Sequence, residues 1–202
     1  MTRGHLGRPA RARAERGRRP ARHRPRLLVL CGPSHAGKST FAEQHCQGFT
    51  VISSDRIRRG LTGRWPRSRR EARTWEVFEQ QKQEALRNGR DVVLDACHLS
   101  RRARWHSVQG PNACHRKVCI VFDPPLEAIL ARCRRTGRVA PGEVKRMWQA
   151  FQASRPTAGE LRRLGFDEVH VLRGGGRRRV RLGREPGSRA AGTRRAGEVA
   201  AG

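Results

Sequence analysis

The chain has 202 residues, with 45 Lys and Arg against 17 Asp and Glu, so its formal net charge is +28. This length allows one α/β domain with a hydrophobic core and argues against two full domains. No stretch comes near the roughly 18 consecutive apolar residues of a membrane span, and no apolar leader lies near the N-terminus, so we expect a cytoplasmic protein with no membrane partner.

Much of the excess Arg lies at the two ends of the chain, in residues 1–25 and 173–202. Both ends are rich in Arg, Gly, Ala and Pro and have few large apolar side chains, so we expect them to be disordered. Three interpretations stay open: basic arms that hold an anionic polymer such as nucleic acid, solvated ends of biased composition, or a transit peptide at the N-terminus. The domain itself is expected at residues 26–172.

Short apolar runs that alternate with helical spacing predict an α/β fold with a five-stranded parallel sheet. The expected strands are residues 27–31, 49–53, 91–96, 117–122 and 168–172. The expected helices are residues 39–46, 71–87, 101–109, 126–135 and 142–153. Ligands of such sheets bind beyond the carboxyl ends of the strands, so we expect the site there.

A phosphate-binding loop follows the first expected strand and opens the first expected helix. The segment Gly-Pro-Ser-His-Ala-Gly-Lys-Ser-Thr fills every required position of the Walker A pattern, whose glycines let backbone N–H groups converge on phosphates. Lys38 would reach the β- and γ-phosphates and Ser39 would bind Mg²⁺. The nucleotide-binding residues predicted here are Gly32, Pro33, Ser34, His35, Ala36, Gly37, Lys38, Ser39 and Thr40.

An acidic residue follows the second expected strand. Asp55 comes after Ser53 and Ser54, and Arg58 lies one helical turn later. Asp55 is placed to accept a proton from an acceptor hydroxyl, and Arg58 to hold an anionic part of that acceptor. The alternative is that Asp55 only caps a helix at residues 56–60.

Two later acids are candidates to organise the metal. Asp95 ends the third expected strand in a Walker B type of arrangement, and Asp123 follows the fourth strand in a similar way. We prefer Asp95, together with Ser39, as the Mg²⁺ site. The sequence leaves the choice between the two acids open.

Several arginines lie where the expected helix 126–135 ends and a Gly-containing loop begins. Such a loop can close over ATP as a lid and place guanidinium groups on the transferred phosphoryl group. The arginines of this segment are Arg132, Arg134, Arg135 and Arg138.

In order and spacing, the motifs GPSHAGKST, ISSDRIRR, VVLDACHLSRRAR and FDPPLEAILARCRRTGRVAPGEVKRMWQAF resemble one group of P-loop kinases. This is the group around the 5′-hydroxyl polynucleotide kinase domain, which also contains tRNA-modifying kinases and zeta-toxin-like enzymes. The resemblance covers about residues 27–172. It implies a kinase-type P-loop fold with a helical lid, and ATP and Mg²⁺ as cofactors.

The resemblance also implies roles for single residues. Lys38 and Ser39 would bind ATP and Mg²⁺, Asp55 would be the general base, and Arg58 would bind the acceptor phosphate. A lid arginine, Arg135 or Arg138, would contact the ATP phosphates.

The sequence departs from the pattern of the group at two positions. His98 stands where the group usually has Asn, and His35 stands where it usually has a small residue. Both changes are compatible with ATP binding.

The favoured function is an ATP-dependent kinase that acts on a nucleic-acid 5′-hydroxyl. The alternatives are a kinase of a small molecule or nucleotide sugar, and a non-catalytic ATP-binding protein associated with nucleic acid. Aromatic stacking platforms are sparse, because the chain has no Tyr and only 4 Trp. We expect these tryptophans to pack in the core or the lid: Trp65, Trp75, Trp105 and Trp148.

Overall fold

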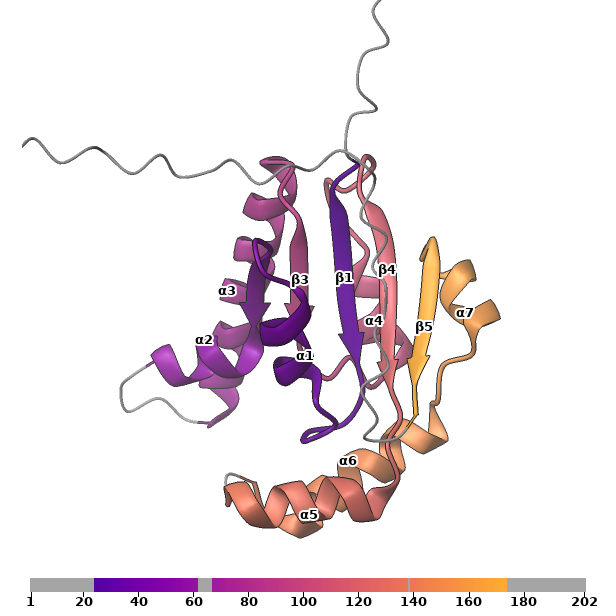
Figure 1. The fold of residues 1–202 in the computed structure, drawn as a ribbon. Helices are drawn as coiled ribbons and strands as arrows, with labels where there is room; N and C mark the ends of the chain where they lie inside the picture. The colour runs from indigo at the N-terminus through magenta and orange to yellow at the C-terminus, as the bar shows by residue number, and fades with distance from the viewer. Residues whose placement is uncertain (1–23, 62–66, 138, 174–202) are drawn as a thin grey trace, which may run out of the picture. The chain divides into compact units, whose positions relative to one another are not determined.

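In a computed structural model, residues 24–61, 67–137 and 139–173 are described. They form one parallel five-stranded sheet with the strand order β2-β3-β1-β4-β5, which confirms the predicted α/β class (Figure 1). The strands are β1 (Arg26–Cys31), β2 (Thr50–Ser53), β3 (Val92–Asp95), β4 (Arg116–Phe122) and β5 (Glu168–Leu172). The helices are α1 (Lys38–His45), α2 (Ser54–Gly60), α3 (Arg67–Arg87), α4 (Arg101–Ser107), α5 (Leu126–Thr136), α6 (Pro141–Ala153) and α7 (Ala158–Arg163).

The central strand β1 is buried on both faces because its side chains are almost all apolar. Residues 27–31 have no solvent exposure, and β1 pairs in parallel with β3 on one side and β4 on the other. The edge strand β5 is only partly buried. The expected arms at residues 1–25 and 173–202 lie almost entirely outside the described residues, so the predicted domain limits stay a prediction.

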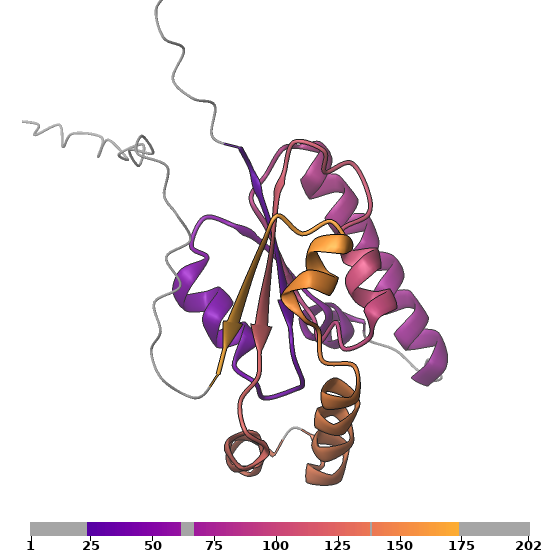
Figure 2. The same ribbon diagram turned by 90° about the vertical axis from the view of Figure 1, so that its right-hand side faces the viewer.

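Helices cover both faces of the sheet, as Figure 2 shows with the sheet seen nearly edge-on. Phe41 and Ala42 of α1 pack with Leu28 and Leu30 on one face. On the other face, α3 and α7 contribute apolar side chains to the larger core, among them Phe78 of α3, and Val108 directly after α4 joins them. The helix α7 was not expected from the sequence.

Helices α5 and α6 form a hairpin beyond the carboxyl ends of the strands (Figure 1). The hairpin has a small core of its own, in which Ile129 and Cys133 of α5 pack against Val144 of α6. Trp148 is partly buried against this core, as expected for a residue that packs in the lid. Phe151, near the end of α6, instead belongs to the core of the sheet.

Hydropathy gives no sign of a membrane span in this part of the chain. None of the helices in the described ranges combines the length and the apolar character needed to cross a bilayer.

Candidate active site

The loop between β1 and α1 has a backbone that only glycine can adopt at two positions. Gly32 has φ 151°, and a Cβ atom there would lie 2.6 Å from the carbonyl oxygen of Phe122. Gly37, directly before α1, has φ 103° in the left-handed region. The loop therefore reaches the first turn of α1 with its backbone turned as a phosphate cradle requires.

Lys38 is folded back onto this loop. Its Nζ donates to the carbonyl oxygens of Gly32 at 3.0 Å and Pro33 at 2.8 Å, and its side chain is buried. Nζ also lies 3.5 Å from the Sγ of Cys97. The ammonium group thus lies at the loop that is expected to bind the phosphates. In this structure it donates its hydrogen bonds to carbonyl oxygens of the loop itself.

Ser39 and Asp95 come together at the end of β3. The Ser39 hydroxyl donates to Oδ2 of Asp95 at 2.8 Å, although the two residues lie 56 positions apart. A hydroxyl beside a carboxylate is a ligand pair suited to Mg²⁺. These oxygens, together with the glycine-built loop, fit a Mg²⁺–triphosphate group.

Asp123, the other candidate acid, is held away from this pair. Its carboxylate accepts from Nε2 of Gln152, in the last turn of α6, at 3.1 Å and forms an ion pair with Arg155, just after that helix. Asp123 does not line the cleft that contains Ser39 and Asp95. The structure therefore gives Asp123 a contact that fastens the lid hairpin to β4.

Helix α2 begins with Ser53 as its cap, which shows that the capping alternative for Asp55 is wrong. The Ser53 side chain accepts from the backbone N–H of Arg56, and Asp55 lies inside the first turn. The Asp55 side chain is 75% exposed and its Oδ1 accepts from Arg58 at 2.6 Å. Asp55 thus presents a carboxylate to the cleft.

Arg58 is held from two sides by carboxylates. Besides Asp55, Glu71 of α3 accepts from Nε at 3.0 Å and from a terminal nitrogen at 2.9 Å. The hydrogen bonds that Arg58 donates to Glu71 raise the pKa of Arg58 above its ordinary value, despite partial burial. The Glu71 contact was not predictable from the sequence, because nothing marks one acid of a long helix as the partner of Arg58.

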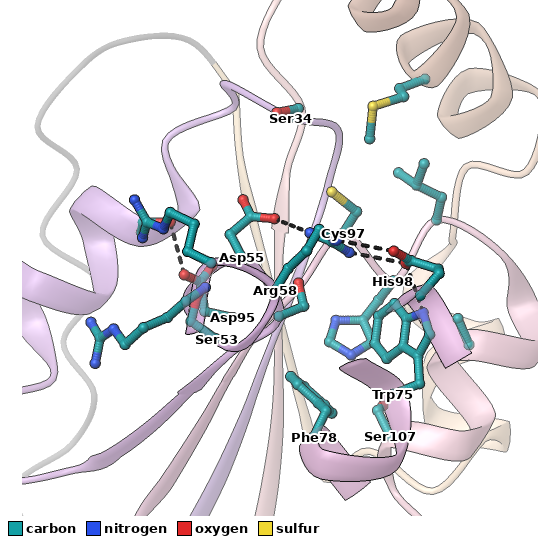
Figure 3. Close-up of a pocket in the computed structure, with 18 of the residues that line it drawn as sticks. Ser34, Ser53, Asp55, Arg58, Trp75, Phe78, Asp95, Cys97, His98 and Ser107 are labelled. Atoms are coloured by element: carbon teal, nitrogen blue, oxygen red, sulfur yellow. Dashed lines mark hydrogen bonds and ion pairs between the residues drawn. The ribbon is translucent and has the colours of Figure 1, made fainter. Parts of the chain in front are cut away.

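One cleft of about 2230 Å³ is lined by Ser39, Asp55, Arg58, Glu71 and Asp95. Figure 3 shows Asp55 and Arg58 beside the cavity, with Asp95 at the ends of the strands and Cys97 and His98 across from them. The cleft exceeds the usual size of a small-molecule pocket, so it has room for a nucleotide and for a second substrate. Residues of the lid segment that line it are Val139, Ala140, Glu143 and Met147.

The lid reaches the phosphate loop through an arginine that the site prediction did not select. Arg132 of α5 donates to the carbonyl oxygen of His35 at 3.1 Å. Arg135, which was selected, is exposed, and Arg138 lies outside the described residues. In a segment so rich in Arg, sequence alone does not tell which guanidinium group faces the loop.

His98 has an unusual backbone and a buried ring. Its φ of 45° lies in the left-handed region, and its Nδ1 is 2.8 Å from the carbonyl oxygen of Leu30. Burial lowers the pKa of His98 from 6.5 to about 4, so the ring is neutral near pH 7. Asn is one of the residues that tolerate positive φ best, so the Asn that the resemblance implies here would suit the same backbone.

Residues 27–155 match a family model described as AAA domain. No curated protein shows significant similarity to the sequence.

Three solved structures show the same fold at low identity. A chain of the Pnkp1/Rnl/Hen1 RNA repair complex is 23% identical, with a TM-score of 0.56 over 66% of this chain and 46% of that one. A Chloroflexus aurantiacus chain named as a kinase is 15% identical, with a TM-score of 0.56 over 74% of this chain and 85% of that one. A chain of the PezAT toxin-antitoxin system of Streptococcus pneumoniae is 14% identical, with a TM-score of 0.56 over 78% and 70%. The present chain thus spans less than half of the RNA repair chain.

Proposed function

Since the chain belongs to the AAA-domain family of P-loop kinase-like proteins, we propose that it transfers the γ-phosphate of ATP to a hydroxyl group. The favoured acceptor is a nucleic-acid 5′-hydroxyl. One observation carries the proposal: the Ser39–Asp95 pair and the exposed carboxylate of Asp55 line the same cleft. A triphosphate on the loop and a hydroxyl beside Asp55 would therefore face each other.

In the proposed reaction, Asp55 takes the proton of the acceptor hydroxyl while the oxygen forms a bond to the γ-phosphorus. The bond from that phosphorus to the bridging oxygen breaks, and its electron pair leaves with ADP. Lys38, whose Nζ donates to the carbonyl oxygens of Gly32 and Pro33, would donate to phosphate oxygens instead. Mg²⁺, held by Ser39 and Asp95, would neutralise phosphate charge.

The test is Asp55→Asn, which keeps the size of the side chain and removes its basicity. Arg58 stays in place in this variant because Glu71 still holds it through two hydrogen bonds. We expect transfer of labelled phosphate to a 5′-hydroxyl oligonucleotide to fall roughly 100- to 10,000-fold, with ATP affinity unchanged. Glu76→Gln is a matched control, because it changes an exposed carboxylate of α3 that does not line the cleft.

Unchanged turnover in Asp55→Asn would show that Asp55 is not the base. A wild-type protein that binds ATP but labels no oligonucleotide would show that the acceptor is wrong.

A small-molecule acceptor is the second candidate, and the state of Arg58 favours it. Both Asp55 and Glu71 hold this guanidinium group, so an acceptor phosphate would have to displace a carboxylate. A neutral acceptor has no such competition. The KM of a nucleic-acid acceptor should rise steeply with salt, whereas that of a neutral small molecule should not.

A further inference from the structure

Trp75 of α3 is exposed inside the cleft, which corrects the expectation that it packs in the core. The residue is 43% exposed and lines the same cavity as Asp55 and Asp95. Trp105 is also exposed, at 44%, but it lines a separate shallow groove with Arg101 and Arg102. Trp65 lies outside the described residues. A large aromatic side chain that stays half exposed in the wall of a cleft points to a ligand that covers it.

The indole of Trp75 is fixed on two sides. Its Nε1 donates to Oε1 of Glu71 at 3.0 Å, one helical turn earlier. On the other side it packs edge-on against Phe78, with ring centroids 5.4 Å apart and an interplanar angle of 67°. Figure 3 shows Trp75 and Phe78 together in the wall of the cavity. Because the ring is already held, a ligand that stacks on it does not have to order it.

Trp75 is also connected to the proposed reacting groups. The same Glu71 oxygen that binds the indole accepts from Arg58, and Arg58 in turn binds Asp55. An acceptor that places its hydroxyl at Asp55 therefore has the free face of the indole within the same part of the cleft.

The chemistry around Trp75 favours a nucleotide over a free sugar. The cavity carries further guanidinium groups, which suit the phosphates that accompany a nucleobase. A neutral sugar has no charge for these groups to bind. The additional arginines that line the cavity are Arg56, Arg59 and Arg70.

We propose that Trp75 is the stacking platform for the nucleobase of the acceptor's terminal nucleotide. This inference rests on the proposed function and adds a specificity residue to it. The base lies against the free face of the indole, and the 5′-hydroxyl of the same nucleotide points to Asp55.

The experiment compares two single-stranded 5′-hydroxyl oligonucleotides that differ only at the terminal nucleotide, which carries a base in one and is abasic in the other. For the wild type, we expect the KM of the abasic acceptor to be roughly 5- to 150-fold higher than that of the acceptor with a base. This factor corresponds to the binding free energy of one base–aromatic stack. In Trp75→Ala this difference should disappear. In Trp75→Phe, which keeps a ring, most of it should return.

Trp105→Ala is the matched control, because it removes an equally exposed tryptophan outside the cleft. It should keep the wild-type preference for the acceptor with a base. If Trp75 has a purely structural role, Trp75→Ala lowers the thermal stability of the protein or changes kcat by the same factor for both acceptors. If Trp75 stacks on the base, the substitution changes the ratio of the two KM values. Should Trp75→Ala not fold, Trp75→Leu fills more of the space without a π face and carries the same expectation.

Equal KM values for the two acceptors in the wild type would overturn the inference while leaving the kinase proposal intact. A preference for the base that survives in Trp75→Ala would overturn it as well. If the wild type labels neither oligonucleotide, the nucleic-acid acceptor itself fails, and the stacking role fails with it.

Discussion

Replacing His98 by Asn should remove most of the pH dependence that the titration of this histidine gives to the free energy of unfolding. The folded protein holds the pKa of this histidine at about 4, against an ordinary value of 6.5. The unfolded chain therefore binds more protons between these two pH values, so the contribution is complete above pH 6.5 and is lost as the pH falls through 4. Each pKa unit corresponds to about 1.4 kcal/mol, so the free energy of unfolding that is lost over the whole pH range is about 3 kcal/mol.

Asn suits the site because it accepts the left-handed backbone and its amide can donate to the carbonyl of Leu30 as the ring does. The assay is urea unfolding of the wild type and His98→Asn at a series of pH values from 7 to 4.5. Other groups titrate in this range, so the difference between the two proteins is the quantity to compare.

The wild type should lose about 2 kcal/mol more than the variant by pH 4.5. His98→Ala separates titration from packing, because it should lose the same pH dependence and also be less stable at every pH. If the free energy of unfolding falls with pH in the same way for the wild type and His98→Asn, the reasoning is refuted.

Two further pairs of variants test the nucleotide side of the cleft. Asp95→Asn should raise the Mg²⁺ concentration that half-saturates activity. Asp123→Asn should lower the melting temperature instead, because its carboxylate is bound by Gln152 of α6 and by Arg155 just after it. The reverse pattern would assign the metal to Asp123. Arg132→Ala should weaken ATP binding about tenfold in calorimetric titration, since its guanidinium lies on the phosphate loop, and Arg135→Ala should weaken it less. An equal loss in both variants would contradict a special role for Arg132.

The strands were predictable because each is a short apolar run with a polar end. Periodicity indicated the parallel class, and the predicted strands differ from the observed ones by at most one residue at each end, as in β2 and β3. The strand order depends on which faces meet in the folded chain, and this information is not local. The position of Ser39 next to Asp95 follows only from that order, in which β1 lies beside β3.

Helix α7 shows a local signal that was available and not used. Thr157 caps it by accepting from the backbone N–H of Glu160, so the segment has Thr and Glu at capping-box spacing. Pro156 before the cap and Gly159 within the helix favour a loop instead. Packing of Leu161 in the core outweighs the weak helix propensity of this short segment.

The contacts of the site were less predictable than the fold, because long side chains such as Arg and Trp have several possible partners. Composition favours a buried Trp75, yet only the fold shows that its face of α3 borders the cleft. In the same way, Arg132 and Arg135 lie on one helix with the same local composition, and only the first contacts the phosphate loop. Such choices depend on which residues of distant segments lie nearby.

The buried guanidinium of Arg104 gives the lid hairpin a fixed end. From α4, it donates to the carbonyl oxygens of Leu99 at 2.6 Å and Ser154 at 3.0 Å, and it pairs with Glu160 of α7 at 3.2 Å. Ser154 directly follows α6, so this end of the hairpin is tied to α4 and α7 through a side chain that is almost completely buried. A movement of α5 and α6 that keeps these contacts would pivot near Ser154.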